Sequence, residues 1–155
     1  MRTFHDLQPG DLFRLGPILV ARTDLLEFVR RFGAGPESPG PAERGALVAP
    51  PASPFLTLSL VTGALFRELR ALGVAVTDLP QLDDVRFPAP VRAHDRLTAE
   101  AEVVTRQLLA GGVGLVHLRL LARNQDRQTV LEGLLALPVA VVPRVQVLAR
   151  QMETR

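Results

Sequence analysis

The apolar residues of this chain follow a helical period in its first half. Four of them recur at the spacing i, i+3, i+4 and i+7, namely Leu25, Phe28, Val29 and Phe32. This spacing predicts an amphipathic helix. Thr23 is placed to cap its start and Gly33 to end it. Before it, residues 12–22 contain two apolar stretches separated by Gly16 and Pro17, which predicts an entry strand or loop packed on the domain.

A second helix is predicted after residue 53. Ser53 is a favourable N-cap, Pro54 suits the first helical position, and Gly73 stands just beyond the expected end. Residues 55–65 are apolar on nearly every side, and charges enter only in the second half. A helix that is apolar all round is normally buried, so we expect this one at the centre of the domain.

Strand-like alternation replaces the helical period beyond Pro80. Residues 97–103 alternate apolar or small residues with polar ones, and residues 113–122 follow after a turn at Gly111 and Gly112. A turn at residues 124–126 precedes a further strand over 129–142, which Gly133 and Pro138 are expected to interrupt. One long buried helix followed by antiparallel strands predicts an α+β domain.

The segment from Gly33 to Pro51 contains four glycines and five prolines in nineteen residues. Such a composition provides no face for a core, and a long loop is expected between the two helices.

Composition narrows the functional classes. The chain has 155 residues, enough for one domain, and no cysteine, which excludes disulfides, thiolate nucleophiles and thiolate metal sites. The pI of about 10.8 reflects the absence of Lys, Tyr and Cys, because the net charge is only +2. Phe is the only aromatic residue, so nucleic-acid binding is not expected. No apolar run is long enough for a membrane span, and we expect a cytoplasmic protein.

Several segments together resemble one family. They are residues 4–11 (FHDLQPGD), 52–58 (ASPFLTL), 86–97 (RFPAPVRAHDRL) and 124–126 (NQD), and the short helix ending at Phe32 has its counterpart there too. In order and spacing they are similar to the MaoC-type acyl dehydratases, which include the (R)-specific enoyl-coenzyme A hydratases. The resemblance implies a single hot-dog domain over residues 1–143, an antiparallel sheet wrapped around a long central helix, with a charged tail over 144–155.

The resemblance fails where the family carries its chemistry. Aligned on Phe32 and Pro36, the catalytic Asp of the family falls on Gly33 and its His on Ser38. Neither residue can exchange a proton near neutral pH, and Glu37 is the only ionisable residue close by. At Pro54 the family usually has a Gly whose backbone N–H is thought to bind the thioester oxygen, and proline has no N–H.

The resemblance also implies a ligand site for an acyl thioester. The candidate acyl-thioester contacts lie on and just before the second helix: Ser53, Pro54, Phe55, Thr57, Ser59, Thr62 and Gly63. The hydroxyls of this set have an alternative role, hydrogen bonding to the carbonyls of their own helix. The candidate phosphate contacts are Arg86, Arg92 and Arg96. No cofactor is expected, apart from coenzyme A as part of a ligand.

The sequence gives little support for a metal site, a paired-carboxylate site or a serine nucleophile. His5, His94 and His117 lack the spacing of metal ligands, and no metal site is expected. Asp83 and Asp84 are adjacent strand residues, which predicts that they point to opposite faces and share no proton. No serine has the surroundings of a nucleophile elbow.

These observations favour a catalytically degenerate protein that binds acyl-coenzyme A or acyl-pantetheine, alone or as the non-catalytic partner of an active hydratase. One alternative is an active (R)-specific enoyl-coenzyme A hydratase with relocated catalytic groups. Another is a dimeric structural module without a ligand. In each case we expect a homodimer or a heterodimer with another hot-dog chain, and neither nucleic acid nor membrane as a partner.

Overall fold

A computed structural model describes residues 1–32 and 51–141 of the chain. Its elements in chain order are η1 (Phe4–Asp6), β1 (Leu12–Leu19), α1 (Arg22–Phe32), α2 (Pro54–Ala71), β2 (Gln81–Arg86), β3 (Arg96–Leu109), β4 (Val113–Arg123) and β5 (Thr129–Ala140). Strands and helices share one core, and the predicted α+β class is confirmed. No helix of the described ranges is long and apolar enough to cross a membrane.

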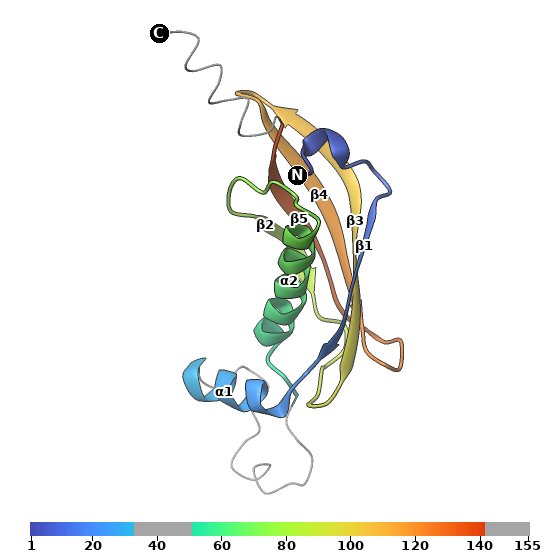
Figure 1. Cartoon of the computed structure of the whole chain (residues 1–155). Helices are drawn as coiled ribbons and strands as arrows, with labels where there is room; N and C mark the ends of the chain where they lie inside the picture. Colours follow the sequence, from blue (N-terminus) through green and yellow to red (C-terminus); the bar gives the residue numbers. More distant parts are fainter. Residues whose placement is uncertain (33–50, 142–155) are drawn as a thin grey trace, which may run out of the picture.

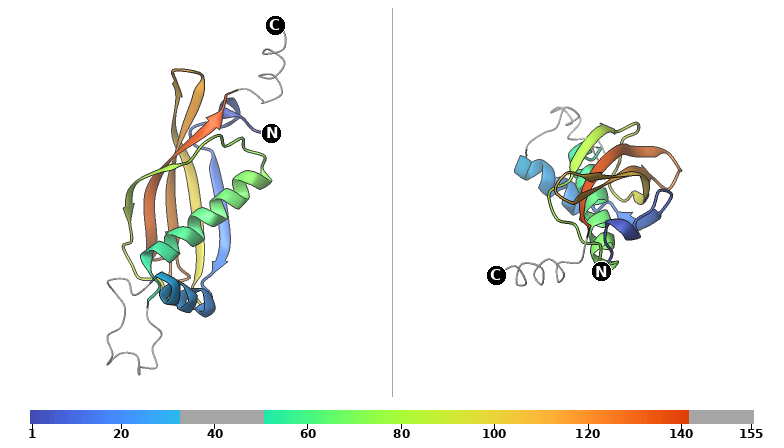
Figure 2. Two further views of the ribbon diagram at one scale, coloured as in Figure 1. Left: turned by 90° about the vertical axis from the view of Figure 1, so that its left-hand side faces the viewer. Right: turned by 90° about the horizontal axis from the view of Figure 1, so that it is seen from above.

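The five strands form one antiparallel sheet in the order β1-β3-β4-β5-β2. The sheet curves around α2, which lies along its concave side (Figure 1). Figure 2 shows α2 crossing the sheet, with α1 near the start of α2 and the N-terminus near its end. The domain therefore has one end at the start of α2, next to α1, and an opposite end where α2 stops, next to the N-terminus.

Alternation along the strands places the core between the sheet and α2. In β4 every second residue, Gly114, Val116, Leu118, Leu120 and Ala122, is buried, as the sequence predicted. From the helix, Leu65 and Leu69 are buried against this face. Each such leucine contributes about 1.5–3 kcal/mol through loss of apolar surface to water, which makes the concave face the main source of stability.

The predicted burial of α2 on all sides is wrong for the single chain. Leu56, Val61 and Leu65 are buried, whereas Phe55 is 65% exposed and Ser59 is also exposed. The sheet reaches only one side of the helix, and residues 1–32 and 51–141 leave Phe55 and Ser59 on the opposite side exposed.

Two other local predictions also need correction. Helix α1 begins at Arg22, and the N–H of Leu25 donates to the carbonyl of Ala21 at 3.2 Å, so Thr23 lies inside the first turn and is not the N-cap. Strand β5 runs without a break through Gly133 and Pro138. The neighbouring strand approaches closely at the first of these positions, because a Cβ on Gly133 would lie 3.2 Å from Val85 Cγ2, a tight contact.

The N-terminal turn η1 is fastened across the end of the β3–β4 hairpin. Arg106 donates from Nη1 to the carbonyls of Phe4 and Leu7 at 3.2 and 3.1 Å, and its guanidinium carbon lies 5.2 Å from the centre of the Phe4 ring. Within the turn, hydrogen bonds from the backbone N–H and then the hydroxyl of Thr3 lower the pKa of the Asp6 carboxyl. The start of the chain is thereby part of the folded domain.

Candidate functional site

The candidate site lies at the N-terminus of α2, where the helix starts as predicted. Ser53 is the N-cap, and its Oγ accepts a hydrogen bond from the N–H of Phe55 at 3.3 Å. Pro54 occupies the first helical position. Proline fits there because the first N–H groups of a helix have no intrahelical partner.

A cavity of about 460 Å³ opens beside this helix start. Its walls come from the helix start, from the connection between β2 and β3, and from the beginning of β5. The lining residues are Pro51, Ala52, Pro54, Thr57, Phe87, Pro88, Ala89, Pro90, Val91, Arg92 and Val130. Most of the lining side chains are apolar, backbone polar groups are exposed among them, and Arg92 is the only charged side chain of this set.

Hydrogen bonds hold the two chain segments of this cavity together. The N–H of Ala52 donates to the carbonyl of Val91 at 2.7 Å. The N–H of Arg92 donates to Asp95 Oδ2 at 2.8 Å, and Asp95 Oδ1 accepts from Gln125 Nε2 at 2.9 Å. The backbone of Arg92 is therefore fixed at the rim of the cavity, while its side chain is exposed.

The helix start offers few free donors to a bound oxygen atom. Pro54 has no N–H. The next N–H, that of Phe55, is directed to Ser53 Oγ, and the N–H of Thr57 donates to the Ser53 carbonyl at 3.1 Å. An oxyanion generated at this position would find less stabilisation than at a helix start that carries a glycine.

The predicted acyl-thioester contacts divide between the two sides of α2. Pro54 and Thr57 line the cavity, and Ser53 caps the helix beside it. The other four predicted residues, which do not line it, are Phe55, Ser59, Thr62 and Gly63. Successive residues of an α-helix are rotated by about 100°, so residues that are close in sequence point to different sides of the helix. The predicted contacts are close in sequence and therefore fall on both sides.

The hydroxyl groups on α2 form hydrogen bonds within the helix. The hydroxyl of Thr57 donates to the Ser53 carbonyl at 3.4 Å, that of Ser59 to Phe55 at 2.8 Å, and that of Thr62 to Leu58 at 2.8 Å. The hydroxyls of these three residues therefore bond to carbonyls of their own helix, which is the alternative role given for them above.

The three candidate phosphate contacts have different environments. Arg92 lines the cavity. Arg86 forms an exposed salt bridge with Asp84 at 2.9 Å, where the pairing of β2 with β5 is irregular and Asp84 has a φ of 48°. The regular alternation assumed for Asp83 and Asp84 does not extend through this irregularity. Arg96 begins β3, and its N–H donates to Gln125 Oε1 at 3.0 Å.

The positions that align with the family's dyad are not among the described residues. Gly33, Glu37 and Ser38 all fall within residues 33–50. The predictions made for them stay predictions.

The histidines of the described ranges belong to three different segments of the fold. His5 belongs to η1, His94 to the turn before β3, and His117 to β4, where its Nδ1 is buried without a hydrogen-bond partner. Over residues 1–32 and 51–141 no group of three or more His, Cys, Asp or Glu side chains is arranged to hold a metal ion. His94 has a φ of 72°, in the left-handed region that Asp84 and Arg127 also occupy.

Several cavity residues were not among the predicted contacts. Ala52, Phe87 and Val130 reach the cavity from three separate segments. In the sequence, residues 86–97 stood out only through the family resemblance and through their three arginines. The Ala52–Val91 hydrogen bond that joins two of these segments leaves no pattern in the sequence.

Comparison with solved structures identifies the architecture. A monoamine oxidase regulatory protein from Archaeoglobus fulgius superposes with a TM-score of 0.78 and 26% identity over 92% of this chain and 96% of the other. A MaoC-like dehydratase from Rhodospirillum rubrum gives 0.74 and 21%, over 92% and 99%. A Mycobacterium tuberculosis protein described as having a double hotdog fold gives 0.72 and 20%, over 92% of this chain and 45% of that one.

Further matching structures include (R)-hydratases and the HadBC (3R)-hydroxyacyl-ACP dehydratase complex. No family model and no curated protein matches the sequence. The predicted hot-dog fold is confirmed by the structural matches, and the neighbours include MaoC-like dehydratases, as the resemblance implied.

Proposed function

Because the chain has the hot-dog fold found in MaoC-like dehydratases and (R)-hydratases, we propose that it binds acyl thioesters without hydrating them. The observation that carries this proposal is the cavity beside the start of α2, which is lined mainly by apolar side chains and has Arg92 at its rim. An acyl chain fits the apolar part and an anionic carrier, coenzyme A or phosphopantetheine, fits the arginine.

Pro54 in the structure and the sequence at positions 33 and 38 support the absence of turnover. Hydration of an enoyl thioester requires a base for the water, an acid for the α-carbon and donors for the thioester oxygen. Pro54 removes one donor, and the residues aligned with the acid and base are Gly33 and Ser38. The rival proposal, an active hydratase with relocated groups, needs Glu37 to take over proton transfer.

Binding is tested by isothermal titration with free coenzyme A, butyryl-coenzyme A and octanoyl-coenzyme A. We expect affinity in the micromolar range or weaker, which increases with acyl length because each buried methylene contributes about 0.8 kcal/mol. Higher salt should weaken binding if an arginine meets the phosphates. Equal or absent binding for all three ligands would favour the structural module instead.

A pair of arginine variants identifies the phosphate contact. Arg92→Ala should weaken octanoyl-coenzyme A binding about tenfold, the loss of one charge-assisted hydrogen bond. Arg86→Ala is the matched control, because Arg86 is exposed, pairs with Asp84 and does not line the cavity. The same loss of affinity in both variants would mean that Arg92 makes no specific contact with the phosphates of the ligand.

We also propose that the chain assembles with another hot-dog chain, itself or a related one. The uncovered side of α2 presents Phe55, which is 65% exposed, and strands β1 and β2 are sheet edges. An exposed apolar helix face and open edges favour association. A partner with an intact Asp–His pair would make this chain the non-catalytic half of a heterodimer.

Expressed alone, the protein is expected to form a homodimer. Size-exclusion chromatography with light scattering should give twice the chain mass of 16.8 kDa. The C2 arrangement in which each copy covers the other's α2 would account for it. A species of 16.8 kDa at micromolar concentration would contradict the prediction.

A further inference from the structure

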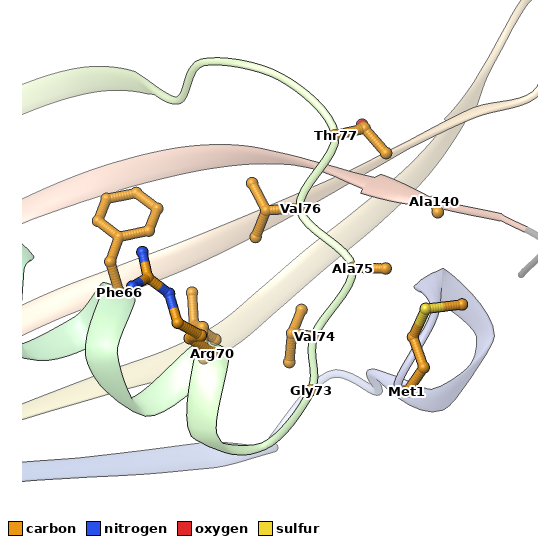
Figure 3. A pocket seen from close by; sticks show the side chains of 10 residues that line it. Met1, Phe66, Arg70, Gly73, Val74, Ala75, Val76, Thr77 and Ala140 are labelled. Carbon is orange, nitrogen blue, oxygen red and sulfur yellow. The ribbon is translucent and has the colours of Figure 1, made fainter. Parts of the chain in front are cut away.

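A second cavity, of about 690 Å³, lies at the opposite end of α2 from the candidate site. One wall is the last part of the helix, with Phe66 and Arg70, and the other is the segment that follows it, residues 73–77. Figure 3 shows these walls, with Met1 and Ala140 at the far end of the cavity. It shares no lining residue with the candidate acyl cavity.

Backbone hydrogen bonds hold the wall formed by residues 73–77 on both sides. The N–H of Ala75 donates to the carbonyl of Arg2 at 2.9 Å, and the Ala75 carbonyl accepts from the N–H of Ala140 at 2.8 Å. The N–H of Thr77 donates to the Pro138 carbonyl at 3.0 Å. With its wall held by the N-terminal segment and by β5, the cavity is preformed.

Its lining side chains are mainly apolar, and Arg70 is the only charged side chain among them. Phe66, Val74 and Val76 pack against the core, and the Arg70 side chain is exposed at the edge. Arg70 forms no salt bridge with any residue of 1–32 or 51–141. The cavity therefore suits an apolar segment that carries an acidic residue.

The sequence beyond β5 has this character. Ala140 lines the cavity, and the described residues end one position later, at Val141. Four apolar residues there are spaced i, i+3, i+4 and i+7, namely Val145, Leu148, Ala149 and Met152. This spacing forms one face of a helix, and Pro143 is compatible with its first turn. Glu153 follows as an acidic partner for Arg70.

We propose that residues 142–155 dock in this cavity through Val145, Leu148, Ala149 and Met152, with Glu153 against Arg70. In helical form the stretch from Val145 to Met152 is roughly 11 Å long, which matches a cavity of this size. The occupant is thus a segment of the chain itself. The competing occupant is a second copy of the chain.

Thiol labelling tests the docking in the full chain, since the protein has no cysteine of its own. Leu148→Cys places a thiol on the docked face, and Arg150→Cys places one two residues later on the opposite face. Reaction with a maleimide should be slowed at least about tenfold for Leu148→Cys, relative to its rate in denaturant, and little for Arg150→Cys. Equal, unslowed rates for both would overturn the proposal.

A second pair of variants locates the docked segment. Adding Phe66→Ser to Leu148→Cys should restore fast labelling, whereas adding Leu79→Ser should not, because Leu79 is 85% exposed and lines no part of the cavity. Circular dichroism checks that both variants are folded. Protection that survives Phe66→Ser in a folded protein, or that falls on dilution as a second copy dissociates, would overturn the proposal.

Charge reversal gives a readout that does not depend on Phe66. Arg70→Glu should speed the labelling of Leu148→Cys about two- to fivefold, and adding Glu153→Arg should reverse that change. No effect of Arg70→Glu at low ionic strength would exclude the Arg70–Glu153 contact. Failure of Glu153→Arg to compensate would exclude it as well.

Discussion

Purified protein is expected to hydrate crotonyl-coenzyme A and longer enoyl-coenzyme A substrates at least about 10³-fold more slowly than an ordinary hydratase. General acid and base groups each contribute roughly 10²–10⁴, and one oxyanion donor about 10²–10³. Gly33, Ser38 and Pro54 replace all three. The losses need not multiply, so the expected deficit is set near that of one group. Loss of the enoyl-thioester absorbance measures the rate.

The same assay separates the two enzymatic alternatives. A rate within tenfold of an ordinary hydratase would contradict the proposed function. Glu37→Gln would then be decisive, because it removes the only ionisable side chain in the first half of the loop that carries the aligned dyad positions. Abolished activity in that variant would identify Glu37 as a relocated base, and unchanged activity would place the catalytic groups elsewhere.

Gly114→Ala is expected to lower the free energy of unfolding by about 3 kcal/mol. A Cβ on Gly114 would lie 2.5 Å from Phe4 Cδ2, 2.6 Å from Cγ and 2.7 Å from Cβ. The Phe4 side chain cannot move aside freely, because Arg106 holds the turn that carries it. Urea denaturation followed by circular dichroism measures the change.

Gly63→Ala provides the matched control for this stability measurement. The nearest atom to a Cβ at Gly63 is Arg67 Nη1 at 3.5 Å, an ordinary contact. Alanine favours a helix interior over glycine by about 1 kcal/mol, so this variant should be stabilised. Equal effects of the two substitutions, or an unchanged midpoint for Gly114→Ala, would show that Phe4 does not depend on the glycine.

The type and order of the helices and strands could be predicted from the sequence, because the patterns that mark them are local. Ser53 and Pro54 mark the start of α2 through capping chemistry, and residues 113–122 alternate between a buried and an exposed face. Such patterns depend on neighbours one to four residues away. The order of elements and the fold class follow from them.

The site was less predictable because it joins segments far apart in the chain. Ala52, Phe87 and Val130 meet only after the sheet has curved around α2. Of the predicted acyl-thioester contacts, Pro54 and Thr57 line the cavity, and the sequence could not show which side of the helix faces it. For Thr23 the capping rule misplaced the start of α1 by two residues, since the helix begins at Arg22 and its first hydrogen bond is accepted by Ala21.

The order of the strands has a consequence for how the domain assembles. Strands β3, β4 and β5 are consecutive in the chain and adjacent in the sheet, so they can form as a meander of short-range hairpins. By contrast, β1 pairs with β3, and both helices lie between these two strands in the sequence. Strand β2 pairs with β5, and β3 and β4 lie between these two in the sequence. Closing these long loops costs chain entropy before any contact is gained. The middle of the sheet is thus the natural nucleus, and its two borders join last.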